Sequence, residues 1–215
     1  MSISRKMIKT WAIFLMASLP LTSVAYANLL TDPGFETPGA PSPTSFTGLL
    51  FGGSSAAQDW VVWNNTSGTT TTELLPSTAP LGGAEMIHVT THGIYNGLYQ
   101  PFLPANTGPS SVIGSAWIYV ISGTVGIGTG NDGNTSPDIL DSTIGQWEFI
   151  QAPNAVTPAN EFIIYSADNS GANFYADNAS VNPVPEPATL VLLGVGLAGV
   201  LFFRNSFRGP RGNIT

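Results

Sequence analysis

Short apolar runs separated by turn residues constrain the fold of this chain more than any other feature. The clearest run, SAWIYVIS, places Trp117 and Tyr119 on one side and Ile118 and Val120 on the other. Alternation of this kind is typical of a strand with one buried face. The middle of the chain has no segment that keeps the 3.6-residue apolar period of an amphipathic helix. We therefore predict an all-β fold, a sandwich or barrel of short strands.

The same pattern predicts strands at intervals between the two ends of the chain. They fall at residues 28–30, 59–63, 69–75, 85–90, 97–103, 115–122, 124–128, 146–151, 161–166 and 173–181. Residues 38–58 are rich in Gly, Ser and Pro, which favours a long surface loop. Residues 126–133 imitate the glycine pattern of dinucleotide-binding loops, but Asn, Asp and Pro follow where that motif requires a helix. We interpret them as a glycine-rich hairpin.

An apolar segment lies at each end of the chain. Residues 1–9 carry three basic side chains, an apolar stretch follows, and residues 25–27 read Ala-Tyr-Ala, which predicts a cleavable signal peptide over residues 1–27. A retained N-terminal anchor is the alternative. The last part, residues 184–211, begins with the motif Val184, Pro185, Glu186 and Pro187.

Residues 188–203 follow that motif without a single charged side chain, and Arg204, Arg208 and Arg211 come directly after them. A helix needs roughly 20 apolar residues to cross a bilayer, so this stretch is short for a stable span. Basic residues on one side only predict a cytoplasmic C-terminus. A buried core helix is the alternative interpretation.

Charge is divided sharply along the sequence. All six Lys and Arg lie outside residues 28–203, and all thirteen Asp and Glu lie inside them. A span with this charge repels itself and favours bound cations. It argues against binding nucleic acid, whose phosphates need Lys and Arg. The chain also has no Cys, which excludes disulfides, a thiolate nucleophile and cysteine metal sites.

The order of motif, apolar span and arginines over residues 184–208 resembles the PEP-CTERM sorting signal of Gram-negative bacteria. That resemblance implies export through the general secretion machinery and an inner-membrane intermediate held by a C-terminal helix. It also implies recognition by an exosortase and a final place at the cell surface or in the extracellular matrix.

A second resemblance covers nearly all of residues 28–181, within a predicted domain over residues 28–183. The motifs NLLTDPGFET, GLYQPF, SAWIYVISG, GQWEFIQAP and NFYADNASV occur in this order, as in jelly-roll β-sandwich domains of the galactose-binding-like and carbohydrate-binding-module class. The resemblance implies a structural calcium that ties the first strand to the last. Glu36 in GFET and Asp177 in YADN match its carboxylate ligands, and calcium prefers such oxygen donors. Ordinary surface carboxylates are the alternative.

Exposed aromatic rings are the remaining binding candidates, because sugar rings stack on them. The candidates are Trp63, Tyr95, Tyr99, Trp117, Tyr119 and Tyr165. We favour the segment in which Tyr95 and Tyr99 stack while Asn96 and Gln100 read hydroxyl groups. The alternative is a structural role, in which most of these rings fill the core.

Other residues receive structural predictions. Trp60, Trp147 and Phe149 are predicted to lie in the core. His88 and His92 share one face of a predicted strand, but two histidines without a third matched ligand make a poor zinc site. We predict ordinary strand or loop histidines.

The sequence therefore predicts an exported, non-catalytic protein of the cell surface or extracellular matrix, associated with polysaccharide. An enzyme is the first alternative, a lyase or hydrolase that acts on the same matrix. A structural coat protein without a ligand is the second. Paired carboxylates across an aromatic groove would favour the enzyme, and a flat polar surface would favour the coat.

Processing is open to a direct test. Mature protein from the native host is expected to begin at Asn28, because the small-residue site ends at Ala27. If the tail is removed, the chain should end near residues 184–187. Intact-mass measurement of the exported protein decides both ends. A mass that still contains residues 190–203 would contradict tail removal and would leave a membrane-anchored protein.

Overall fold

The computed structural model describes residues 28–65, 68–102, 111–131, 134–135, 138–152, 159–184 and 196. The predicted signal peptide lies outside the described residues, as do the sorting motif beyond Val184, the apolar span apart from Gly196, and the C-terminal arginines. Within the described parts of the chain, no helix has the length and apolarity needed to cross a membrane.

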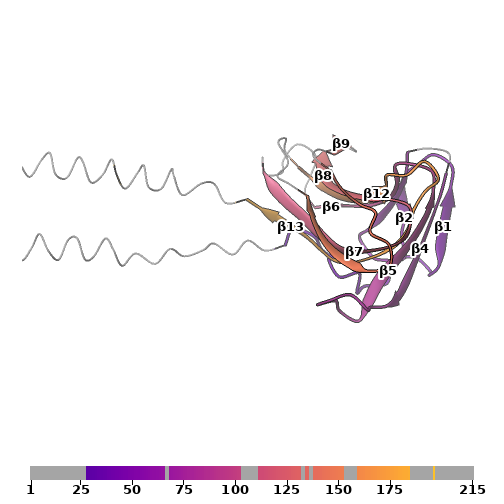
Figure 1. Cartoon of the computed structure of the whole chain (residues 1–215), viewed down its shortest axis with the longest axis horizontal. Coiled ribbons are helices and arrows are strands. Elements are labelled where there is room, and N and C mark those ends of the chain that lie inside the picture. The colour runs from indigo at the N-terminus through magenta and orange to yellow at the C-terminus, as the bar shows by residue number, and fades with distance from the viewer. Residues whose placement is uncertain are drawn as a thin grey trace, which may run out of the picture.

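The described residues form an all-β sandwich of two antiparallel sheets (Figure 1). The first sheet, in spatial order, contains Thr44–Thr47 (β1), Thr69–Pro76 (β4), Glu85–His92 (β5), Asn173–Pro183 (β13), Val112–Ser122 (β7) and Trp147–Ala152 (β11). The second contains Ile139–Asp141 (β10), Val125–Asn131 (β8), Glu161–Ser166 (β12), Asn96–Pro101 (β6), Val61–Asn64 (β3) and Leu50–Ser54 (β2), and Asn134–Thr135 (β9) pairs with β8.

Alternation along the strands builds the core between the sheets. On β7, Ile118 and Val120 are fully buried, while Trp117 and Tyr119 are half-buried on the outer face. The predicted alternation of this strand is therefore confirmed. Phe162 contributes a fully buried ring from the facing sheet. Burial of such apolar surface is the dominant favourable contribution to folding.

Trp60 fills the end of this core. Its ring centroid lies 4.6 Å from that of Phe35 and 6.3 Å from that of Phe162. Its indole Nε1 donates a hydrogen bond of 2.8 Å to the Asp32 carbonyl oxygen, so its polar atom is satisfied although the residue is buried. The prediction that Trp60 belongs to the core is confirmed.

The first described residues lie against β13, the last strand of the sandwich. The Leu29 amide donates to the Val181 carbonyl at 2.9 Å. The Asn28 side chain completes the contact: its Nδ2 donates to the Ala179 carbonyl at 3.0 Å, and its Oδ1 accepts from the Val181 amide at 2.9 Å. Residues 28–30 are consequently held by β13 but form no strand of their own, which corrects the prediction for that segment.

The predicted loop over residues 38–58 is wrong in its centre. Thr44–Thr47 joins the first sheet as β1, and Leu50–Ser54 joins the second as β2. β1 pairs with β4, and β2 pairs with β3. The register between β2 and β3 shifts at a bulge at Gly52, whose φ is 99°. Turn-rich composition hid these strands because edge strands are short and carry many small residues.

Residues 126–131 of the glycine-rich segment lie in β8, which pairs with β9, as expected for a hairpin and not for a dinucleotide loop. Gly126 pairs with Tyr165 of β12, and a Cβ at Gly126 would overlap the Tyr165 ring. Glycine therefore allows a tyrosine of the next strand to lie flat across β8.

Two core predictions are wrong. Phe149 is 51 % exposed and Trp147 is half-buried, both on the outer face of β11. Their ladder partners are Trp117 and Tyr119, whose side chains also point outward. The register with β7, which the sequence does not contain, fixes this outcome.

Two phenylalanines give a matched stability test. Phe162→Ala removes a fully buried ring and is expected to lower the free energy of unfolding by about 3–5 kcal/mol. Phe149→Ala removes the same atoms from an exposed position and should change it by about 1 kcal/mol or less. Urea unfolding of both variants measures the difference. Equal losses would contradict the assignment of the inner and outer faces.

Candidate functional site

Two carboxylates predicted as metal ligands meet beside the loop that joins β4 and β5. Asp177 of β13 is fully buried there, and the Ser77 hydroxyl and the Asn178 amide both donate to its carboxylate. Glu36 Oε1 accepts a hydrogen bond of 3.3 Å from the Glu85 amide. The structure thus brings both predicted residues to one loop.

Glycines in that loop leave room for the carboxylates. A Cβ at Gly82 would overlap an Asp177 carboxylate oxygen, and a Cβ at Gly83 would overlap Glu36 Oε1. A side chain at either position would thus fill the cradle in which these oxygens lie.

Backbone strain collects around the same cradle. Phe35, Leu81 and Asn178 have φ of 57°, 60° and 49°, in the left-handed region that favours glycine. The Asn178 side chain also donates to the Leu81 carbonyl, which ties β13 to the loop. Strained residues of this kind persist where the surrounding structure holds them, as the bond between Asn178 and Leu81 does here.

Burial makes this place unfavourable for negative charge. It raises the pKa of the Asp177 carboxyl, and the nearby Glu36 charge raises it further, while hydrogen bonds from Ser77 and Asn178 act in the opposite direction. The pKa of Asp32, in the same N-terminal segment, is also raised by burial, and the amides of Thr37 and Glu36 lower it. A cation beside these groups would stabilise their charged forms.

The donor set suits a hard cation. Both side chains offer carboxylate oxygens, the type of ligand calcium prefers. Across the described residues, no group of three or more His, Cys, Asp or Glu side chains is arranged to hold a metal. A calcium ion between Glu36 and Asp177 would therefore take its remaining ligands from backbone carbonyls or water. Gly82 and Gly83 give the two carboxylates room beside the loop, and their role as calcium ligands stays a prediction.

The side chains of the predicted sugar-binding segment, residues 95–100, do not all face the same way. Tyr95 is 45 % exposed and Tyr99 is half-buried. Asn96 and Gln100 are fully buried: the Asn96 side chain donates to the His92 carbonyl at 2.8 Å, and Gln100 Oε1 accepts from the Thr31 amide at 3.1 Å. Alternation on β6 turns both amides inward, so this geometry leaves only the two tyrosines for a ligand. Their binding role stays a prediction.

The outer face of the second sheet holds those tyrosines in an aromatic cluster. The Tyr165 ring centroid lies 5.9 Å from that of Tyr95 and 6.3 Å from that of Trp63. The Tyr165 hydroxyl donates to Asp138 Oδ2 at 2.6 Å. Burial and this bond raise the pKa of Tyr165, and burial with the Glu161 charge raises that of Tyr99. Both phenols therefore remain neutral at physiological pH.

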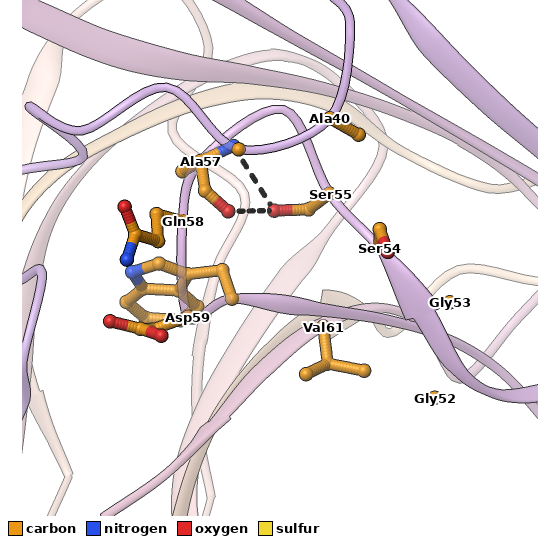
Figure 2. Close-up of a pocket in the computed structure, with 11 residues that line it drawn as sticks. Ala40, Gly52, Gly53, Ser54, Ser55, Ala57, Gln58, Asp59 and Val61 are labelled. Carbon is orange, nitrogen blue, oxygen red and sulfur yellow. Dashed lines mark hydrogen bonds between the residues drawn. The ribbon is translucent and has the colours of Figure 1, made fainter.

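A groove of about 410 Å³ lies elsewhere, between residues 39–40, β2 and the segment that enters β3 (Figure 2). Small side chains and glycines form most of its lining. Ser55 Oγ donates to the Ala57 carbonyl at 2.8 Å and accepts from the Ala57 amide at 3.2 Å, which fixes the turn at its rim. Trp60 borders the groove but is only 2 % exposed, so it offers no stacking surface. None of the predicted site residues lines it.

The histidines lie on β5. His88 faces outward, with Nε2 2.7 Å from Asn173 Oδ1 and Nδ1 3.7 Å from Glu73 Oε2. His92 is exposed at the end of the same strand. The prediction of ordinary strand histidines agrees with these contacts.

Sequence reasoning found only Trp117 and Tyr119 of a second aromatic surface, on the outer face of the first sheet. It consists of Trp117, Tyr119, Trp147, Phe149 and Tyr175. The spacing of Trp147 and Phe149 shows that they share a face of a strand. Only the pairing with β7 shows that this face looks outward.

Comparison with known proteins supports the two resemblances separately. Residues 183–206 match the PEP-CTERM protein-sorting motif, which indicates an exported protein processed at the membrane. No curated protein sequence matches the chain.

Among solved structures, an arabinose-bound α-L-arabinofuranosidase superposes with a TM-score of 0.50 and 15 % identity over 74 % of this chain. The chain spans only 26 % of that enzyme, so the likeness concerns the fold of one part of it.

Carbohydrate-binding modules of jelly-roll fold are also among the structural neighbours. A family 11 module from Clostridium thermocellum, 12 % identical, aligns over 60 % of this chain and 92 % of its own, with a TM-score of 0.43. A xylan-binding CBM22-1 domain from Paenibacillus barcinonensis, 13 % identical, aligns over 68 % and 96 %, with a TM-score of 0.38. The prediction of an all-β sandwich is confirmed by the two antiparallel sheets of the described residues.

Proposed function

We propose that this chain is a non-catalytic, polysaccharide-associated protein of the cell surface or extracellular matrix. The sorting motif follows the last strand directly, since β13 ends at Pro183 and the motif match begins there. In this proposal an exosortase recognises residues 184–187 while the apolar span engages the inner membrane. Arg204 and Arg208 then remain on the cytoplasmic side.

Aromatic rings at the surface of an acidic sandwich carry the proposal. Tyr95 and Phe149 are 45 % and 51 % exposed, and each contacts further rings on its own sheet. Exposed apolar surface of this kind marks interaction sites. Rings with polar neighbours suit sugars, which present C–H groups on one face and hydroxyls at the edge. The α-L-arabinofuranosidase neighbour, whose structure contains arabinose, agrees with a sugar-related use of the fold.

The enzyme alternative is less well supported by the carboxylates. Glycoside hydrolysis needs two acids that flank a bond in solvent reach. The carboxylate pair formed by Glu36 and Asp177 does not meet that need, because Asp177 is fully buried. The coat alternative predicts a surface without stacked aromatic rings, which does not describe either outer face.

The test measures how far the purified protein migrates in native gels with and without the host's own extracellular polysaccharide. Retarded migration without release of reducing ends or unsaturated sugars is the expected result. Release of either product would establish the lyase or hydrolase instead. Unchanged migration in every polysaccharide fraction would favour a coat protein without a ligand.

A structural calcium between Glu36 and Asp177 is also proposed, supported by the cradle at Gly82 and Gly83. The ion would neutralise the buried Asp177 carboxylate and the exposed Glu36 carboxylate in a domain that contains no Lys or Arg. It would fix the loop between β4 and β5 to β13, and thereby act as a staple instead of a catalyst.

Calcium should raise the thermal midpoint. At a hundredfold excess over Kd, binding stabilises the folded state by about 2.7 kcal/mol. For a domain of this size, that is a shift of roughly 5–10 °C relative to chelator. Asp177→Asn should lose this response. Asp141→Asn, which changes another buried carboxylate, should keep it.

Sodium and magnesium at matched ionic strength control for general screening of negative charge. If calcium stabilises no more than magnesium, or if Asp177→Asn responds as fully as the wild type, the proposed calcium site is wrong.

A further inference from the structure

The outer face of the first sheet carries aromatic side chains in two adjacent cross-strand rows. We call Trp117, Tyr119, Trp147, Phe149 and Tyr175 the aromatic face. Trp147 pairs with Tyr119, Tyr119 with Tyr175, and Tyr175 with His88 of β5. Phe149 and Trp117 pair in the next row. Because neighbouring strands lie about 4.8 Å apart, the row from His88 to Trp147 spans about 14 Å across four strands.

The rings of the aromatic face touch one another. The centroid of Tyr119 lies 5.6 Å from that of Trp147 and 5.7 Å from that of Tyr175, and Tyr175 lies 4.9 Å from His88. Trp117 and Phe149 are 5.4 Å apart. Their mutual contacts explain why these rings are only half-exposed although no other layer of the sandwich covers them. A surface of rings packed against one another is stiff, so a ligand finds it already ordered.

Polar groups border the rings on two sides. Asn173 and Thr90 lie beside His88, with Asn173 Oδ1 2.7 Å from His88 Nε2 and 3.4 Å from Thr90 Oγ1. On the opposite side, Trp147 Nε1 donates to Thr78 Oγ1 at 3.4 Å. Amide and hydroxyl groups at the edge of a ring surface are suited to the hydroxyls of a sugar that lies on it.

The negative charge of the domain limits which ligands the aromatic face can bind. Glu73 stands at the end of the row next to His88, and residues 28–203 contain no Lys or Arg to attract an anion. An anionic polymer is therefore repelled by this domain, and so is a second copy of the same acidic chain. A polymer that is neutral, or that carries amino groups able to lie over aromatic faces, meets no such barrier.

We propose that the aromatic face is a binding platform for a non-anionic polysaccharide, which lies across β13, β7 and β11. This inference rests on the proposed polysaccharide association and adds where the chain binds and which class of glycan it takes. The platform is on the opposite sheet from Tyr95 and Tyr99, so the two surfaces can be tested independently.

The experiment uses the purified protein in calcium, with the host's extracellular polysaccharide separated by anion exchange into neutral or cationic and acidic fractions. The wild type is expected to bind the first fraction. Trp147→Ala should weaken this binding about tenfold, because truncation of a stacked Trp removes a dominant contact. Trp147→Phe should keep most of the affinity, since a ring remains. Phe51→Ala, which removes an exposed ring of β2 on the opposite sheet, should change it less than twofold, and Tyr95→Ala tests the other predicted surface.

Stability and assembly are measured in parallel. Thermal midpoints show whether Trp147→Ala is folded, and Phe149→Ala supplies a second variant of the platform at a more exposed position. Light scattering reports the oligomeric state. A dimer that Trp147→Ala dissociates, with glycan affinity unchanged, would make this face a contact between copies and overturn the proposal.

The remaining outcomes separate this inference from the proposed function. If Tyr95→Ala abolishes binding while both platform variants retain it, the polysaccharide association stands and the platform is wrong. A preference for the acidic fraction would overturn the glycan class. Failure of the wild type to bind any fraction would remove both proposals together.

Discussion

Pairing on both edges of β13 is the interaction on which the rest of this structure depends. The strand forms ladders with β5 and β7, and the first residues of the described chain dock on its far end through Asn28. This strand thus joins β5 to β7 within the first sheet and also holds the N-terminal segment. It also delivers the chain to the sorting motif, which begins where β13 ends.

A bulge in that same strand creates the carboxylate cradle. The register with β7 shifts between Asp177 and Ser180, and Asn178 takes a left-handed conformation there. The bulge takes Asn178 and Ala179 out of the ladder directly after Asp177, which still pairs with Trp117 and lies beside the loop that joins β4 and β5. The buried Asp177 carboxylate has no Lys or Arg partner within residues 28–203, so the hydrogen bonds from Ser77 and Asn178, a proton or a cation must offset its burial.

The aromatic rings on the two outer faces differ in their exposure and packing. On the second sheet, Tyr165 and Trp63 are buried, and Tyr95 provides the exposed ring above them. On the first sheet, the rings support one another sideways and remain half-exposed together. The loop that contacts Asp177 through Ser77 also touches this face, since Thr78 accepts from Trp147. The proposed calcium staple would therefore also hold one border of the aromatic face.

The sequence by itself determined the fold class, most strand positions, the acidic character and the C-terminal sorting motif, because alternation, turn residues and a linear motif are properties of neighbouring residues. It also indicated Glu36 and Asp177, far apart in the chain, through a resemblance, and the tertiary structure brought both to one loop. The tertiary structure alone decided that residues 44–54 form edge strands, that Asn96 and Gln100 face the core, and that Trp147 and Phe149 face outward. The reason is register: alternation shows which side chains share a face, but only pairing with distant strands selects the face that is buried.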